Sequence, residues 1–143
     1  MPGCIFLDLF AGTGSIGIEA LSRGAQRAVF VESRSKNIKV IKDNLSITGF
    51  EPKAWVLQQD VAGALPFLKN EGLVFDLIFM DPPYSKDFET RTLAGIAIHG
   101  LIKPCGTVIV ESRKNGLLPR EIYDLKMVRQ EKYGDTMLSF YSK

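Results

Sequence analysis

The sequence predicts an α/β fold, a doubly wound Rossmann-like sheet that is mostly parallel. Short, continuous apolar runs alternate with segments of helical periodicity as far as Glu111. Such alternation is typical of parallel strands buried between two layers of helices. A glycine-rich turn follows the first apolar run, and Gly134-Asp135 separates two strand-like segments near the end of the chain. We therefore expect a nucleotide-type loop after the first strand and an antiparallel C-terminal hairpin.

The bulk composition bounds the class of protein. The 143 residues are 45% hydrophobic and 24% charged, which suits a single globular domain over residues 1–143. No apolar run approaches the roughly 18 residues of a membrane span, and no secretory signal pattern opens the chain. We expect a cytoplasmic protein without a membrane partner, with a monomer favoured. Cys4 and Cys105 lack metal-ligand spacing, and a net charge of +2 neither requires nor excludes nucleic acid.

Each expected strand is a short apolar run bounded by polar, glycine or proline residues. The parallel strands are expected at residues 5–9, 27–32, 53–58, 75–80 and 107–111, and the hairpin strands at 123–133 and 136–141. Pro104-Cys105-Gly106 is interpreted as the turn that leads into the fifth strand.

The expected helices follow the first four strands, and each has apolar residues on one face. Ser33 or Ser35 is expected to cap the second helix, and Pro66 either delays the start of the third helix or kinks it. The inward-facing residues are expected to be Ile16, Ala20 and Leu21 in the first helix, Ile38, Ile41 and Leu45 in the second, Val61, Leu65 and Leu68 in the third, and Leu93, Ile96 and Ala97 in the fourth.

Polar features gather where the expected strands end. The glycine loop follows the first strand, and Glu32, Asp60 and Glu111 end or follow three later strands. The tetrapeptide Asp81-Pro82-Pro83-Tyr84 follows the fourth strand. Because parallel strands end at one edge of their sheet, all of these features should converge there, and ligands of such sheets bind at that edge.

The glycine loop is compatible with two adenosine-containing cofactors. Gly12, Gly14 and Gly17 satisfy the dinucleotide fingerprint, and Glu32 stands where a carboxylate accepts hydrogen bonds from ribose hydroxyls. NAD and S-adenosylmethionine (SAM) both carry that ribose. Asp8, at the end of the first strand, would repel a pyrophosphate and suits a cationic ligand, either directly or by orienting the loop. SAM carries a sulfonium and an ammonium group, and Gly17 is then expected to be a close-packing position.

Asp60 has two compatible interpretations. It follows the third expected strand and precedes a helical pattern, so its side chain can cap that helix. The same position suits an acceptor for the adenine amine of a cofactor. We expect both roles.

The tetrapeptide Asp81-Pro82-Pro83-Tyr84 indicates a site for an amine on a planar base. Two prolines fix the backbone and remove two N–H donors, while their carbonyls remain as acceptors. Asp81 and the Pro82 carbonyl could each accept one N–H, and Tyr84 could stack on the ring. The alternative is a turn that ends a strand, with Tyr84 as surface cover.

These residues resemble the class I SAM-dependent methyltransferases, and in particular the bacterial small-subunit rRNA guanine-N2 methyltransferases of the RsmD type. The resemblance rests on the stretches Leu7-Asp8-Leu9-Phe10-Ala11-Gly12-Thr13-Gly14, Val31-Glu32, Asp81-Pro82-Pro83-Tyr84 and Tyr133-Gly134-Asp135-Thr136. It implies a seven-stranded sheet with an antiparallel last strand. Members of that family also carry an extension before the glycine-loop strand, which helps to close over SAM and engage RNA; this sequence begins almost at that strand.

The resemblance also implies the ligands and the site. SAM is the methyl donor, S-adenosylhomocysteine (SAH) is the product, and ribosomal RNA or the small ribosomal subunit is the partner. The implied cofactor-binding residues are Asp8, Phe10, Ala11, Gly12, Thr13, Gly14, Glu32, Asp60 and Val61. The implied catalytic residues are Asp81, Pro82, Pro83 and Tyr84.

The expected reaction is an in-line displacement at the SAM methyl group by the N2 amine of a guanine. A sulfonium is a good leaving group, so we expect no metal, and positioning should supply most of the acceleration. Three alternatives stay open: an amino-methyltransferase for adenine N6 or a glutamine side chain, an NAD-dependent oxidoreductase, and a non-catalytic RNA-binding module. The first often carries Asn in place of Asp81, and the second gives residues 81–84 no role.

Overall fold

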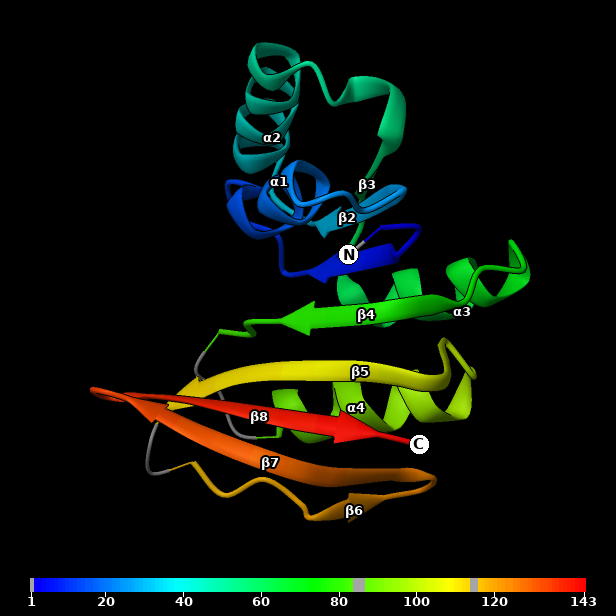
Figure 1. Ribbon diagram of the computed structural model, residues 1–143, viewed down its shortest axis with the longest axis vertical. Helices are drawn as coiled ribbons and strands as arrows, with labels where there is room; N and C mark the ends of the chain where they lie inside the picture. Colours follow the sequence, from blue (N-terminus) through cyan, green and yellow to red (C-terminus); the bar gives the residue numbers. More distant parts are fainter. Residues whose placement is uncertain (1, 84–86, 114–115) are drawn as a thin grey trace.

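The computed structural model describes residues 2–83, 87–113 and 116–143, and these form one eight-stranded sheet in the order β3-β2-β1-β4-β5-β8-β7-β6 (Figure 1). The strands are β1 (Ile5–Leu9), β2 (Arg27–Glu32), β3 (Ala54–Gln58), β4 (Phe75–Met80), β5 (Ile102–Arg113), β6 (Glu121–Ile122), β7 (Leu125–Tyr133) and β8 (Thr136–Ser142). The helices are α1 (Ser15–Ser22), α2 (Ser35–Thr48), α3 (Val61–Asn70) and α4 (Phe88–Ile98), with a short 3-10 helix η1 (Glu51–Lys53).

The predicted fold class is confirmed. Strands β1 to β5 pair in parallel, and β8 lies antiparallel between β5 and β7. The sheet differs from the implied seven strands by the two-residue strand β6, which pairs with the start of β7. A strand this short has no periodicity in the sequence that could have predicted it.

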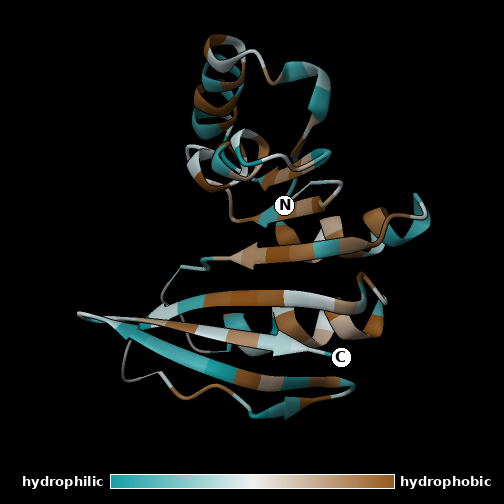
Figure 2. Cartoon of the chain, in the orientation of Figure 1, coloured by the Kyte–Doolittle hydropathy of each residue, from teal (hydrophilic) through white to brown (hydrophobic). Residues whose placement is uncertain are grey.

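The core lies in two layers, one on each face of the sheet. Helices α1 and α2 pack on β1, β2 and β3, while α3 and α4 cover the opposite face, behind β4 and β5 in Figure 1. Strands β4 and β5 are largely apolar, whereas β7, near the sheet edge, is mostly hydrophilic (Figure 2). The face of β4, β5 and β8 that lies away from α3 and α4 carries no helix among the described residues.

The fifth strand is longer than predicted. It begins at Ile102, and Pro104-Cys105-Gly106 forms a bulge within the strand where a turn was expected. The pairing with β4 shifts between Phe75 and Leu77, and Cys105 takes a left-handed φ of 70°. Proline and glycine correctly indicated a break in the regular backbone at this position. They did not distinguish a turn from a bulge, because both use the same residues.

Two details of the helices also differ from the prediction, and for a third the structure excludes one of the two predicted alternatives. Ile16 is 44% exposed, and Gly17 joins Ala20 and Leu21 on the buried face of α1. Arg34 occupies the N-cap position of α2 without a side-chain cap, so neither serine caps that helix. Helix α3 begins at Val61 and contains Pro66, so it does not start late.

Gly17 explains why the buried face of α1 differs from the predicted one. A Cβ at this position would lie 2.3 Å from Cε2 of Phe30, whose side chain is fully buried in β2. The absence of a side chain therefore lets α1 lie directly on the ring. Gly17 is a close-packing residue, as the sequence predicted, and the contact fixes how closely the glycine loop approaches β2.

We predict that Gly17→Ala lowers the free energy of unfolding. In an ordinary helix the change to alanine stabilises by about 1 kcal/mol. Here overpacking against Phe30 should destabilise by about 1–3 kcal/mol, measured by urea denaturation. The exposed residue Ser15 begins the same helix and serves as the control. A Gly17→Ala protein more stable than wild type, beside a neutral Ser15→Ala, would contradict the close-packing role.

Candidate active site

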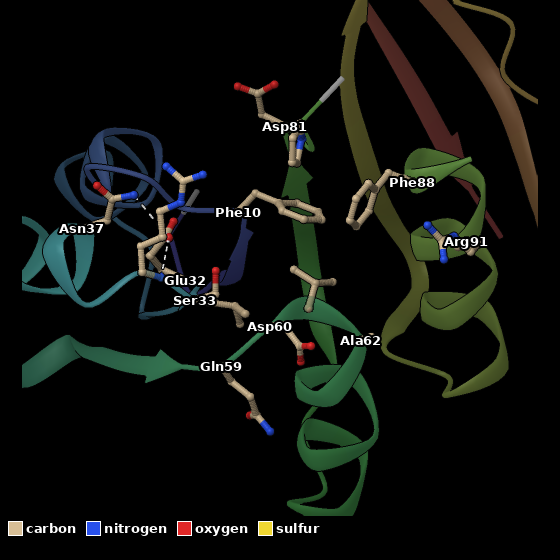
Figure 3. A pocket seen from close by; sticks show the side chains of 14 residues that line it. Phe10, Glu32, Ser33, Asn37, Gln59, Asp60, Ala62, Asp81, Phe88 and Arg91 are labelled. Carbon is tan, nitrogen blue, oxygen red and sulfur yellow. Dashed lines mark hydrogen bonds between the residues drawn. The ribbon is translucent and has the colours of Figure 1, made fainter. Parts of the chain in front are cut away.

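A cavity of about 500 Å³ opens at the carboxyl ends of the parallel strands (Figure 3). It is lined by Phe10, Val31, Glu32, Ser33, Arg34, Asn37, Gln59, Asp60, Val61, Ala62, Asp81, Pro83, Phe88 and Arg91. The structure thus brings together Glu32, Asp60 and Asp81, which follow three different strands. Its volume lies within the range of about 300–1,000 Å³ that is usual for sites of small ligands and cofactors.

Several predicted site residues do not line the cavity. Asp8 lies beneath the glycine loop with 1% of its surface exposed. Ala11, Gly12, Thr13 and Gly14 form the loop itself, and Pro82 is buried. Tyr84 lies outside the described residues, so the stacking role expected for it stays a prediction.

Carboxylates from within the fold hold the glycine loop. The Gly12 N–H donates to Oε1 of Glu32 at 2.8 Å, and the Gly17 N–H donates to Oδ2 of Asp8 at 3.1 Å. The Gly14 N–H donates to the Ala11 carbonyl at 2.8 Å. These three N–H groups are therefore already bonded within the protein. A pyrophosphate site instead needs loop and helix N–H groups that point at the ligand.

Glu32 has little remaining capacity for hydrogen bonds. Besides the Gly12 bond, its Oε2 accepts from the Arg34 N–H at 3.0 Å and from Nδ2 of Asn37 at 3.3 Å. A carboxylate has about four acceptor sites, so one site is left for a ligand without displacing a partner. A second donor from a ligand would have to replace the longer bond from Asn37.

Asp8 is buried where an ionised carboxylate is costly. Burial raises the pKa of Asp8 from 3.8 to about 7, the Gly17 N–H opposes that rise, and the charges of Asp81 and Glu32 add to it. Because Asp8 bonds to the first turn of α1, the structure favours the role of orienting the loop over direct contact with a ligand. A cation above the loop would stabilise the ionised form.

Asp60 is the N-cap of α3, which was one of its two predicted roles. Its Oδ1 accepts from the Gly63 N–H at 3.0 Å. The side chain also lines the cavity beside Val61, and the cap uses only one of its oxygens. The adenine role is therefore compatible with the cap and stays a prediction.

Asp81 forms a carboxyl pair with Glu111 at the end of β5. The partial burial of both groups is the main cause that raises their pKa values above the ordinary range. The hydrogen bond between them lowers the pKa of Asp81 and raises that of Glu111, and the charge of Asp81 raises the pKa of Glu111 further. Their interaction thus favours a proton on Glu111 over a proton on Asp81.

An aromatic wall was not predicted from the sequence. The rings of Phe10 and Phe88 meet edge to face at 5.8 Å, and the Arg91 guanidinium lies 5.2 Å from the Phe88 ring centre. Phe10 takes a left-handed φ of 60°, an uncommon conformation for a bulky residue that tends to occur at functional sites. Phe88 and Arg91 lie three residues apart on α4, a spacing that signals contact on a helix but not its location.

The family model described as "Conserved hypothetical protein 95" matches residues 1–142. The chain belongs to this family. The resemblance predicted from the glycine loop and residues 81–84 is thus confirmed at the level of the family.

Curated relatives match most of the chain. The Bacillus subtilis protein YlbH is 36% identical over 137 residues, which are 96% of this chain and 74% of YlbH. Ribosomal RNA small subunit methyltransferase D of Haemophilus influenzae is 33% identical over 112 residues, covering 76% of this chain and 56% of that enzyme. Its Escherichia coli K12 namesake is 28% identical and covers 96% and 67%. The chain thus spans between about half and three quarters of the length of these relatives.

Solved structures share the fold. A conserved hypothetical protein of Streptococcus pyogenes superposes with a TM-score of 0.91 at 35% identity, covering 100% of this chain and 88% of that one. SMU.776, solved in complex with SAH, superposes with a TM-score of 0.83 over 99% of this chain and 46% of its own. At 12% identity the second likeness concerns the fold alone. No helix among the described residues of this family member is long and apolar enough to span a membrane.

We predict that Asp8→Asn changes how stability depends on pH. The folded pKa of Asp8 is raised from 3.8 to about 7, so the stabilisation due to its proton is complete below about pH 4 and is lost as the pH rises through 7. Asparagine is neutral throughout and keeps an acceptor for the Gly17 N–H. The variant should therefore gain up to roughly 4 kcal/mol relative to wild type between pH 4 and 8.

The measurement is a series of urea denaturations of both proteins across that pH range. A constant offset between the two proteins reflects the buried amide and does not bear on the prediction. Parallel curves, with no growth of the difference toward pH 8, would show that Asp8 titrates normally.

Proposed function

We propose that this domain is a cytoplasmic SAM-dependent methyltransferase that modifies the exocyclic N2 amine of a guanine in small-subunit ribosomal RNA. The observation that carries the proposal is the meeting of Asp81 with Glu32 and Asp60 on one cavity at the carboxyl edge of the sheet. One end of that cavity carries acceptors for an adenosine, and the other carries an acceptor-rich rim.

The residues present fit SAM better than a dinucleotide. The N–H groups of Gly12 and Gly17 are bonded to carboxylates, which leaves them unable to bind a pyrophosphate. Asp8, Glu32 and Asp81 supply negative charge around the loop, which suits a cation. In this proposal Glu32 holds the ribose, Asp60 and Val61 hold the adenine, and Asp8 acts through the loop. When bound, SAM supplies an electrophilic methyl group on its sulfonium.

The rim formed by Asp81 and the Pro82 carbonyl favours guanine. Guanine presents two neighbouring donors, N1–H and the N2 amine, whereas adenine presents a donor beside the acceptor N1. A carboxylate and a proline carbonyl can only accept, so an adenine N1 would meet a like partner there. The target guanine has to be unpaired or flipped out, because its N2 amine is otherwise engaged in pairing.

The protein contributes mainly position and charge. The N2 amine is a weak nucleophile because its lone pair is delocalised into the ring. Hydrogen bonds from the amine to Asp81 and the Pro82 carbonyl would hold it in line with the methyl group. The amine loses one proton on methylation, and Asp81, whose pKa is raised by burial, is placed to accept it.

The assignment to ribosomal RNA is supported by the relatives. The Haemophilus influenzae and Escherichia coli proteins are named ribosomal RNA small subunit methyltransferases. Those names do not specify the methylated atom, so the guanine N2 position rests on the donor and acceptor pattern of the rim. Mapping the methylated nucleotide in ribosomal RNA from a deletion strain would identify both the base and its position.

We predict that Asp81→Ala lowers methyl transfer by about 100-fold or more, because it removes the main acceptor for the reacting amine. Transfer of a tritiated methyl group from SAM to small-subunit RNA measures the rate, and calorimetry should show SAM affinity within a few-fold of wild type. Asp43 is an exposed aspartate on α2 and provides the matched control. Near-normal turnover of Asp81→Ala would remove Asp81 from the catalytic assignment.

We predict that Glu32→Ala weakens SAM binding, and that Glu32→Gln weakens it by about tenfold. A hydrogen bond to a charged group contributes about 1.5–3 kcal/mol, and the glutamine keeps only one acceptor oxygen for the Gly12 N–H or the ribose. Calorimetry measures the affinity, and thermal melting without ligand separates loss of folding from loss of binding. Unchanged SAM affinity in a folded Glu32→Gln protein would exclude Glu32 from the ribose site.

A further inference from the structure

The register of β4 and β5 places Glu111 beside Asp81. Met80 pairs with Val110 across the parallel ladder, so Asp81, the first residue after β4, comes next to Glu111 of β5. Met80 and Val110 are buried in the core beneath α3 and α4. Because successive side chains alternate between the faces of a sheet, Glu111 points to the other face, while Asp81 lies one residue beyond the end of β4.

The register brings the two carboxyl groups close enough for each to shift the pKa of the other, and a hydrogen bond between two carboxyl groups requires a proton on one of them. That bond raises the pKa of Glu111 and lowers the pKa of Asp81, so Glu111 is the donor and Asp81 the acceptor. The negative charge of Asp81 also raises the pKa of Asp8, from β1. On its other side Glu111 faces Leu138 of β8, which carries no charge. Both effects of the hydrogen bond favour Asp81 over Glu111 as the ionised member of the pair.

Glu111 has no part in the reaction as proposed above. It does not line the cavity, and none of the cofactor or base contacts uses it. Asp81 is an exposed residue and Glu111 a half-buried one, and two acidic groups side by side repel each other unless a proton is shared. The two acids lie together at the rim, next to the proposed position of the guanine N2 amine. This arrangement does not serve the stability of the fold and calls for another explanation.

We propose that Glu111 is a positioning residue for Asp81, an inference that rests on the proposed function. By donating to one oxygen of Asp81, the Glu111 carboxyl fixes the orientation of that side chain and leaves the other oxygen to accept from the N2 amine. Asp81 directly follows β4 and precedes Pro82, so its backbone leads out of the sheet into the rim. A catalytic group held by such a partner loses less entropy and misaligns less when the substrate binds.

The activity test compares two substitutions at Glu111. Glu111→Ala removes the donor and should lower kcat by about tenfold to 100-fold, in line with the cost of a displaced reacting group. SAM affinity should be unchanged, because Glu111 lies outside the cavity. Glu111→Gln keeps an N–H donor and should retain kcat within about threefold of wild type. If Glu111 had a purely structural role, the loss of kcat in each variant would instead follow its loss of folding stability.

Glu131 gives a matched control. It lies on β7, in the same cross-strand row as Glu111 and Leu138, where it pairs with Arg129 and Tyr133. Glu131→Ala removes a glutamate from the same face at a distance from Asp81, so its kcat should match that of wild type. A loss in Glu131→Ala equal to that in Glu111→Ala would overturn the positioning role, because it would show a general effect of charge on this face.

A second measurement does not depend on activity. Carbon-13 NMR of the glutamate carboxyl groups should show Glu111 titrating above the ordinary range in the wild-type protein. In Asp81→Asn the neighbouring charge is removed, so the pKa of Glu111 should fall toward its ordinary value. A Glu111 pKa that is unchanged by Asp81→Asn would show that the two groups do not interact and would overturn the inference.

The outcomes separate the inference from the proposed function. If the wild-type protein binds SAM but transfers no methyl group to ribosomal RNA, the proposed function fails, whatever the NMR shows of the carboxyl pair. If the wild-type protein is active and Glu111→Ala keeps normal kcat, only the positioning role fails. Loss of activity in Glu111→Ala with recovery in Glu111→Gln, together with the shifted titration, supports both.

Discussion

The bonding of the glycine loop to internal carboxylates is the constraint on which the site depends. Glu32 binds the Gly12 N–H and Asp8 binds the Gly17 N–H, so two strands and one helix fix the loop from below. The contact of Gly17 with Phe30 adds a steric limit, because no side chain could be inserted there without moving a fully buried ring. The loop therefore shares its spacing with dinucleotide sites, while the N–H groups of its three fingerprint glycines are bonded within the protein. Sequence spacing alone cannot separate these two cases, but the hydrogen bonds can.

The carboxylates that hold the glycine loop belong to a larger group of acidic side chains at one edge of the sheet. Asp8, Glu32, Asp81 and Glu111 come from four different strands, and all lie near the carboxyl ends of the parallel ladder. Burial raises the pKa of Asp8, Asp81 and Glu111, which shows that the fold tolerates this charge at a cost. A cationic ligand offsets that cost, whereas an anionic one would add to it. The electrostatics and the bonding of the loop thus favour the same class of cofactor.

Much of this architecture was predictable because it follows from burial. Continuous apolar runs located every parallel strand, and the end of each run located Glu32, Asp60 and Asp81 at one edge. Predictions that needed atomic packing were less successful. Ile16 has the correct helical spacing for the core, yet the position of Phe30 turns α1 so that Gly17 is buried and Ile16 is exposed. Phe88 and Arg91 reached the cavity only through the docking of α4, which no local pattern specifies.

The carboxyl pair shows how a distant irregularity can set the geometry of a site. Between Ile102 and Thr107, β5 contains a bulge, whereas the facing segment of β4 runs only from Phe75 to Leu77. The bulge decides which residue of β5 stands beside Asp81. A shift of one residue would place Ser112 or Val110 there and would turn Glu111 toward the core under α3 and α4. The conformation at Cys105, at the opposite end of the strand, therefore determines that two acids meet at the rim. Proline and glycine marked this position in the sequence, but only the pairing of the strands shows that its consequence lies at the candidate active site.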